Sequence, residues 1–274
     1  MFSKKNLLAV LLCIVMTALL AGCGGGEQKT PAPADNEKKV GAIKHLNESE
    51  EDFGKSLGDN HKATFYDSMN AMQMALDAGQ IDAISTYKNV ADYLVARNDK
   101  FEIVPDSTSK FSDYFCFAVR GSDIELHREL DVALDAMTQD GTLEKLTKEY
   151  ITDLKKDQDP PAVEIQHIDG ADTLKIAVTG DLPPMDLVLA DGQIAGFNTA
   201  MLAEMAKRLN KNVEIIQVES AARASALTSD KADVIFWAIQ PADNTRPQTI
   251  DTPEGVVLTK PYFKDDVVEV GLKK

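Results

Sequence analysis

From Val40 to the C-terminus, short apolar runs that suit β-strands alternate with segments of helical periodicity, and this alternation constrains the fold most. For example, the strand signal at Ala63–Tyr66 precedes a helix signal that places Met69, Met72 and Leu76 on one face. Parallel strands joined by helices are typical of α/β proteins. The sequence therefore predicts the α/β class.

Two such runs are separated by a polar stretch. The first run spans residues 40–151 and the second spans residues 173–274. Residues 152–172 lie between them, contain two consecutive prolines and carry only weak strand signals, so we interpret them as a connector. The two runs together are long enough to form two lobes, each with its own core.

The second run contains the sharpest local signals. Thr173–Val178 is predicted to be a strand, and Leu187–Phe197 to be a hairpin that turns at Asp191 and Gly192. Asn198 or Thr199 is then expected to cap a helix. This order of strand, hairpin and helix is the frame in which the candidate site residues are placed below.

The N-terminal segment resembles a bacterial lipoprotein signal peptide. Two lysines precede an apolar run over residues 7–20, and small residues then lead directly to Cys23. The resemblance implies cleavage after residues 1–22, acylation of the Cys23 thiol with lipid such as palmitate, and a flexible tether over residues 23–39. The alternatives are a short membrane anchor and an ordinary secretory signal. On the lipoprotein interpretation the protein is held at the extracytoplasmic face of the cell membrane.

The charge and the reactive side chains exclude several classes of function. A formal net charge of -15 argues against nucleic acid as a partner. Beyond Cys13 and Cys23 the only cysteine is Cys116, so the mature chain has no pair for an internal disulfide, and Cys116 is expected to be buried and inert. The four histidines have no metal-ligand spacing, and we expect no metal, no cofactor and no catalytic residues.

The second run is similar to the opening half of the bacterial extracellular solute-binding proteins of family 3, which feed amino acids to ABC importers. The matching pieces are residues 174–178, 181–185, 192–198, 226–235 and 261–263. The first run resembles the rest of the same fold, through residues 76–84 and the closing helices within 130–150. The resemblance implies a two-lobed type 2 periplasmic-binding-protein fold.

The two runs stand in the opposite order to that family, with the usual ending before the usual beginning. We therefore predict a circularly permuted chain, in which residues 40–151 supply a second lobe and the closing helices, and residues 173–274 supply the first lobe. Such a rearrangement is tolerated when the original termini lie close together on the surface. The alternative is a pair of incomplete lobes that another chain completes.

The resemblance assigns ligand-binding roles in the first lobe. Arg246 is the candidate that holds a ligand carboxylate, because a planar guanidinium matches two oxygens, and Arg223 is its rival. Trp237, followed by Ala238, stands where many relatives carry a small polar residue and could stack on the ligand or pack in the core. Asp181 and Met185 flank a proline turn near the expected cleft; the family often has an aromatic residue there, and this chain has none. 

The second lobe departs further from the family pattern. Amino-acid binders usually have an aspartate five residues after the position that corresponds to Asp82 here, and that aspartate holds the ligand ammonium group. Here that position is Tyr87, preceded by Thr86, and a phenol does not supply a negative charge. We still predict both residues in the cleft. The acidic residues of 48–52 would repel an incoming carboxylate, so the exact ligand stays open.

The leading functional hypothesis is a lipid-anchored binding protein that passes a small polar ligand, an amino acid or a relative, to an ABC transporter permease. One alternative is a lipoprotein that senses its ligand for a membrane signalling partner. Another is an enzyme like the cyclohexadienyl dehydratases on the same fold, which would need a general acid in the cleft.

Overall fold

The first strand begins at Lys38, two residues earlier than the start at Val40 that the sequence pattern indicates. A computed structural model describes residues 37–105, 107, 111–155 and 157–274, and Glu37–Lys274 form one compact unit. The predicted signal peptide, Cys23 and the tether up to residue 36 lie outside the described residues. The predicted tether boundary at residue 39 is wrong, because Lys38 and Lys39 pair with β2 as the start of strand β1.

The first sheet has five strands in the order β2-β1-β3-β13-β4. The strands are β1 (Lys38–Ile43), β2 (His61–Tyr66), β3 (Ala83–Tyr87), β4 (Phe101–Ile103) and β13 (Phe263–Leu272). Strands β1, β2 and β3 are parallel, whereas β13 is antiparallel to both of its neighbours. The one strand of reversed direction therefore comes from the far end of the chain.

The second sheet repeats this order as β10-β6-β11-β5-β12. Its strands are β5 (Ser112–Arg120), β6 (Thr173–Val178), β10 (Asn212–Gln217), β11 (Val234–Pro241) and β12 (Val256–Leu258). Again three strands are parallel and the inserted one, β5, is antiparallel. Each sheet thus takes one strand from the part of the chain that builds the other.

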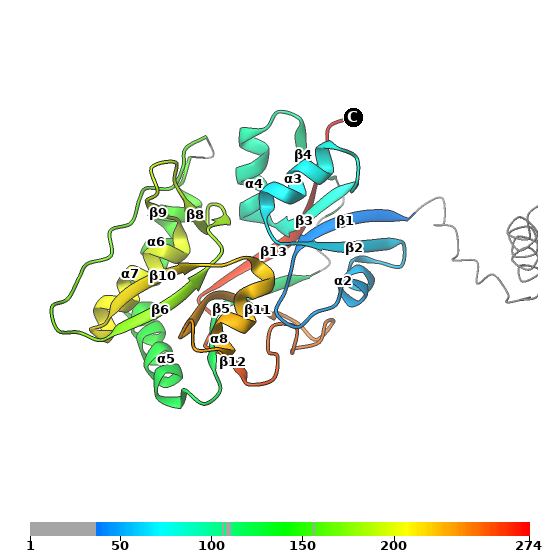
Figure 1. Cartoon of the computed structure of the whole chain (residues 1–274). Helices are drawn as coiled ribbons and strands as arrows, with labels where there is room; N and C mark the ends of the chain where they lie inside the picture. Colours follow the sequence, from blue (N-terminus) through cyan, green and yellow to red (C-terminus); the bar gives the residue numbers. More distant parts are fainter. Residues whose placement is uncertain (1–36, 106, 108–110, 156) are drawn as a thin grey trace, which may run out of the picture. The chain divides into compact units, whose positions relative to one another are not determined.

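Strands β5 and β13 connect the two sheets. Residues Phe263–Asp266 of β13 pair with Ser112–Phe115 of β5, and residues Val267–Val270 of β13 pair with β3. The chain leaves the first sheet through β5 and returns to it through β13, which runs between the two groups of strands in Figure 1. The two sheets are therefore two halves of one unit, joined by two adjacent antiparallel strands.

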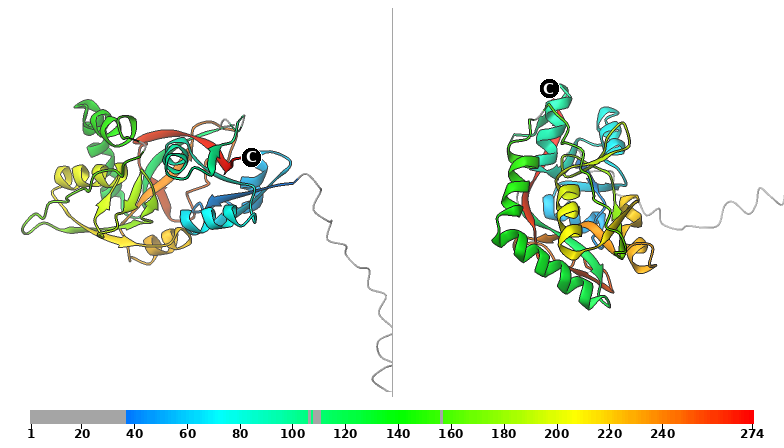
Figure 2. Two further views of the ribbon diagram at one scale, coloured as in Figure 1. Left: turned by 90° about the horizontal axis from the view of Figure 1, so that it is seen from above. Right: turned by 90° about the vertical axis from the view of Figure 1, so that its left-hand side faces the viewer.

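Helices cover the parallel strands of each half. The first half has α2 (Glu50–Leu57), α3 (Met69–Asp77) and α4 (Lys88–Arg97). The second half has α5 (Ile124–Gln139), α6 (Thr142–Thr147), the π-helix η1 (Lys148–Thr152), α7 (Phe197–Leu209), the 3₁₀-helix η2 (Ser220–Ala222) and α8 (Arg223–Thr228). Helices α5 and α6 precede the connector in sequence but contact α7 beyond it, as Figure 2 shows.

Local side chains explain where the helices begin. Ser49 caps α2 and Ser68 caps α3, because the Ser49 hydroxyl accepts from the Asp52 amide and the Ser68 hydroxyl accepts from the Ala71 amide. The predicted cap of α7 by Asn198 or Thr199 is wrong. The helix starts directly after Gly196, whose φ of 108° and close approach to the Met185 carbonyl leave no room for a Cβ.

The predicted hairpin is confirmed as part of a small third sheet. This sheet has the order β7 (Asp181–Leu182), β8 (Asp186–Val188) and β9 (Ile194–Ala195). The turn between β8 and β9 contains Gly192 at a φ of 85°, which favours glycine. The small sheet leads into α7 and carries the loop whose residues approach the first half of the molecule.

The core supports the sequence interpretation of Cys116. This residue is fully buried in β5, and burial raises the pKa of its thiol to about 12, so the thiolate nucleophile is suppressed. Over the described ranges, no helix reaches the length and apolarity needed to cross a membrane.

Candidate functional site

A small cavity lies where the two halves meet. Its volume is about 20 Å³, enough for about one water molecule. It is lined from both halves by Ala42, Ile43, His45, Phe53, Ser85, Thr86, Tyr87, Asp113, Leu182, Trp237 and Val267. The structure therefore holds the two halves closed on each other, and a ligand larger than water requires them to separate.

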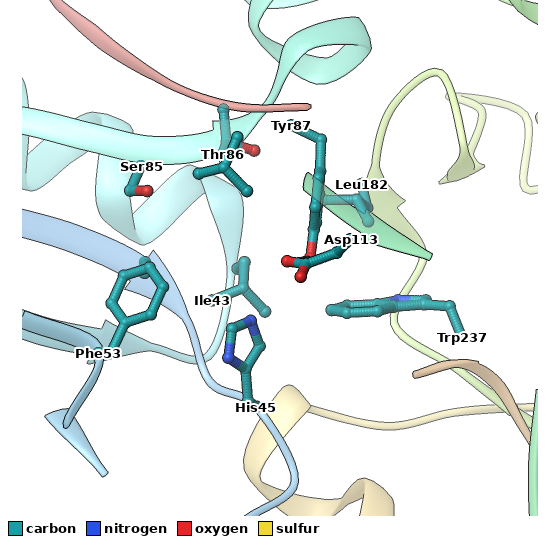
Figure 3. Close-up of a pocket in the computed structure, with 11 residues that line it drawn as sticks. Ile43, His45, Phe53, Ser85, Thr86, Tyr87, Asp113, Leu182 and Trp237 are labelled. Atoms are coloured by element: carbon teal, nitrogen blue, oxygen red, sulfur yellow. Dashed lines mark hydrogen bonds between the residues drawn. The ribbon is translucent and has the colours of Figure 1, made fainter. Parts of the chain in front are cut away.

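A buried carboxylate dominates the polar wall of this cavity. Asp113 lies near the start of β5, and Figure 3 shows the Tyr87 side chain reaching toward it. The Tyr87 hydroxyl donates to Asp113 Oδ2 at 3.1 Å. Burial raises the pKa of the Asp113 carboxyl, and the adjacent Arg246 guanidinium opposes that shift. Burial also raises the pKa of Tyr87 well above its ordinary value, so this phenol remains a hydrogen-bond donor.

Arg246 lies behind Asp113 and is almost completely buried. Its Nη1 donates to Asp113 Oδ1 at 2.9 Å and to Oδ2 at 3.0 Å, and its guanidinium lies 4.0 Å from the centre of the Phe111 ring. The Nε and Nη2 groups have no hydrogen-bond partner. Buried donors without hydrogen bonds are rare in folded proteins, so Nε and Nη2 are the groups of Arg246 that could still take an acceptor.

A second carboxylate approaches the same guanidinium from the loop before α2. Glu48 Oε2 lies 3.7 Å from Arg246 Nη2 and contacts His45 Nδ1 at 2.5 Å. The side chains of Glu48 and Arg246 are each 2 % exposed. The loop is anchored to the other half, since the Asn47 amide donates to the Ile250 carbonyl at 2.8 Å and the Leu46 amide to Asp251.

Arg223, the rival candidate to Arg246, donates to three backbone carbonyls. Its Nη1 donates to the Trp237 carbonyl at 2.8 Å, its Nη2 to the Lys44 carbonyl at 2.7 Å and its Nε to the Ser220 carbonyl at 3.3 Å. The guanidinium also stacks on the Trp237 ring at 3.9 Å. All three guanidinium nitrogens of Arg223 donate hydrogen bonds. Arg223 therefore holds the Trp237 indole in place and connects the two halves through the Lys44 carbonyl.

The other predicted site residues divide into two groups. Trp237, Tyr87 and Thr86 line the cavity. Met185 and Ala238 are fully buried but are not among the described lining residues; Ala238 pairs with Cys116 in the sheet. Asp181 lies at the start of the small sheet and bridges the halves, since its Oδ2 accepts from the Met69 amide at 2.8 Å at the first turn of α3.

Sequence reasoning missed three of the residues that define this site: Asp113, Glu48 as a buried group, and His45. Asp113 directly precedes the apolar run of β5, and a carboxylate at that place is the one signal that could have marked it. Within the described ranges no cluster of His, Cys, Asp or Glu could hold a metal ion.

Asp186 provides a test of the electrostatics beside the cavity. Its Oδ2 accepts from the Thr179 amide, the Thr179 hydroxyl and the Gly180 amide, and burial raises the pKa of its carboxyl to about 6. A raised pKa in the folded state means that protonation stabilises the fold. This stabilisation is complete below the ordinary pKa of aspartate and is lost as the pH rises through about 6.

We therefore expect Asp186→Asn to unfold with a weaker pH dependence than the wild type between about pH 4 and pH 6. The amide oxygen still accepts hydrogen bonds, but the side chain can no longer ionise. Urea unfolding at several pH values measures this slope, and Asp169→Asn on the exposed connector is the matched control. An Asp186→Asn slope equal to that of the wild type would contradict the raised pKa.

Two sheets of matching strand order, joined by two antiparallel strands and with a small cavity between them, define a two-lobed α/β protein. Residues 174–268 match the family model of bacterial extracellular solute-binding proteins, family 3. The resemblance deduced from the second run is thereby confirmed for this segment of the chain. No curated protein sequence matches the chain.

Solved structures that match the chain include three ligand-binding proteins. One is the ligand-binding component of an ABC-type import system from Staphylococcus aureus with zinc bound, at 10% identity and a TM-score of 0.43, covering 86% of this chain and 65% of that one. A second is the GluR0 ligand-binding core from Nostoc punctiforme with L-glutamate, at 12% identity and a TM-score of 0.37, covering 86% of this chain and 85% of that one. A third is an amino acid ABC transporter substrate-binding protein from Streptococcus pneumoniae bound to L-arginine, at 11% identity and a TM-score of 0.39. It covers 87% of this chain and 82% of that one.

Proposed function

We propose that this protein is a lipid-anchored extracytoplasmic solute-binding protein that delivers a small polar ligand, an amino acid or a relative, to an ABC importer. The observation that carries the proposal is the buried Arg246, which pairs with the cavity-lining Asp113 and whose Nε and Nη2 make no hydrogen bond within the described residues. A ligand carboxylate is the acceptor that best matches two adjacent N–H groups of one guanidinium. The family match of residues 174–268 supports the same class of function.

Hinged closure follows from the contacts between the two halves. The bonds from Met69 to Asp181, from Arg223 to the Lys44 carbonyl and from Asn47 to the Ile250 carbonyl all cross the cleft. Opening the cleft breaks them together, whereas the pairing of β5 with β13 can persist as the hinge. A ligand that contacts both halves then favours the closed state through its differential affinity.

The permuted order is part of this proposal. The crossing of the chain through β5 and its return through β13 fit a single complete clamp, with residues 40–151 and 173–274 as its swapped segments. The connector would then join the former termini, and α5 and α6 would be the closing helices that pack on α7.

Ligand binding is tested by isothermal titration calorimetry with the twenty amino acids, using the full-length protein in detergent. We expect at least one amino acid to bind with a 1:1 stoichiometry and to raise the unfolding temperature by mass action. The Arg246→Lys variant is expected to bind it more weakly, because an ammonium group cannot make the planar two-point contact. Absence of binding by every amino acid would reject an amino acid ligand.

The lipid anchor is tested separately. Labelled palmitate is expected to be incorporated into the wild type and not into Cys23→Ser, which should leave the membrane fraction. Equal labelling of both proteins would reject Cys23 as the acylated residue. Importer coupling is tested by ligand-dependent stimulation of the permease ATPase, which a purely sensing lipoprotein would not produce.

A further inference from the structure

Glu48 places a carboxylate beside Arg246 from the opposite half of the molecule. It lies in the loop between β1 and α2, whereas Arg246 follows β11. Glu48 Oε2 lies 3.7 Å from Arg246 Nη2, and each side chain is 2 % exposed. The two groups form an ion pair, but this distance is too long for a hydrogen bond. The contact therefore neutralises charge and leaves the Nη2 donors unused.

The unused donors of Arg246 are adjacent groups of one guanidinium. Nη1 donates to both carboxylate oxygens of Asp113. Nε and Nη2 make no hydrogen bond within the described residues. Two adjacent N–H groups match the two oxygens of a carboxylate. Since Glu48 Oε2 lies at Nη2, the Glu48 carboxylate stands where a ligand carboxylate would bind.

The loop that carries Glu48 is tied to the opposite half by its own backbone and side chains. The Asn47 amide donates to the Ile250 carbonyl at 2.8 Å, and Asn47 Nδ2 donates to the Thr249 carbonyl at 3.0 Å. Protein groups alone make these contacts. They therefore hold Glu48 at the Arg246 guanidinium whenever the cleft closes without a ligand.

A ligand carboxylate and Glu48 cannot share this place. Asp113, 1 % exposed, is already one carboxylate partner of Arg246. With Glu48 and a ligand both present, three carboxylates would face one guanidinium in a place that water barely reaches. Removing the Glu48 charge makes the cluster more positive by one unit whether the neighbouring His45 imidazole is charged or neutral. A ligand carboxylate is therefore bound better once Glu48 has left.

We infer that Glu48 is an internal occupant of the carboxylate site: it pairs with Arg246 when the cleft closes without a ligand, and a ligand carboxylate must displace it. The inference rests on the proposed solute-binding function and adds a specificity-determining residue to it. A carboxylate that accepts from both Nε and Nη2 gains two hydrogen bonds that Glu48 does not make. An anion that accepts at one point gains less, so Glu48 favours a planar two-oxygen ligand.

The test removes the Glu48 carboxylate and supplies another in its place. In full-length Glu48→Ala, sodium acetate is expected to raise the unfolding temperature by about 2 °C or more relative to sodium chloride at the same concentration, because acetate binds the folded state. Acetamide, which has a similar shape and no charge, should give no shift. The wild type and Glu51→Ala, which removes an exposed carboxylate of α2, should not respond to acetate. Equal shifts in the wild type and Glu48→Ala, or none in either, overturn the inference.

The Glu48→Gln variant links this residue to the ligand. For the amino acid that binds the wild type most tightly, the affinity of Glu48→Gln should be about tenfold higher, because a like charge no longer opposes the ligand carboxylate. An affinity at or below that of the wild type overturns the inference and leaves the solute-binding proposal standing. If no amino acid binds either protein, the amino acid proposal fails and the acetate shift alone decides this inference.

If the Glu48 variants do not fold, the wild type decides. The protein is refolded from urea to remove any bound solute, and the single tryptophan is then quenched with acrylamide. Trp237 lines the cavity and is 1 % exposed, so a cleft that Glu48 helps to close without a ligand should give weak quenching. Strong quenching would show that the cleft stays open without a ligand and would overturn the inference.

Discussion

Replacing Arg246 with alanine is expected to lower the free energy of unfolding by about 3–5 kcal/mol. The substitution leaves Asp113 and Glu48 buried without their shared cation, and each carboxylate is at most 2 % exposed. It also removes the packing of the guanidinium on Phe111. Urea unfolding at pH 7.5, followed through the fluorescence of the single tryptophan, measures the loss.

Two further variants make this result specific. Arg128→Ala removes an exposed arginine that pairs only with a neighbour on the same helix, so its denaturation midpoint should equal that of the wild type. Adding Asp113→Asn to Arg246→Ala should recover part of the loss, because one of the two carboxylates that lose the Arg246 guanidinium is then replaced by a neutral amide. Equal midpoints for Arg246→Ala and Arg128→Ala would show that Arg246 is not a buried ion-pair partner.

The sheets were predictable because each strand has a local signal. The burial of β3, β5 and β11 on both faces produces near-continuous apolar runs, and helices between them explain the periodic segments. The crossing of β5 and β13 has no such signal, since strand pairing across about 150 residues leaves no trace in local periodicity. The start of α7 was missed because Gly196 is required by backbone contact and not by a capping side chain.

The candidate site was predictable only where a residue type is unusual for its surroundings. Trp237, Tyr87 and Thr86 were placed in the cleft because of their position in the family pattern, and the structure brings them to the cavity. Glu48 was grouped with the exposed acids at the start of α2, and its burial depends on contacts with the distant Arg246. Such contacts follow from closure of the two halves and are not encoded in any one segment.

Arg223→Ala is expected to lower the free energy of unfolding by about 2–4 kcal/mol, because three backbone carbonyls lose a charged donor. It should also release the Trp237 ring, which stacks on the guanidinium and is 1 % exposed. The emission maximum of the single tryptophan is therefore expected to move to longer wavelength in the folded variant.

The same substitution tests whether Arg223 holds the two halves of the protein together or binds the ligand. Arg223 donates its hydrogen bonds to the backbone carbonyls of Lys44, Ser220 and Trp237. Its loss should therefore favour the open form even without ligand. Small-angle scattering should then detect a larger radius of gyration. Arg223→Lys retains the charge but cannot reach three carbonyls and stack on the indole at once, so it should fall between alanine and the wild type. An unchanged emission maximum and radius in Arg223→Ala would mean that the two halves are held together without it, and the closing contacts would then have to come from the Asp181 and Asn47 bridges alone.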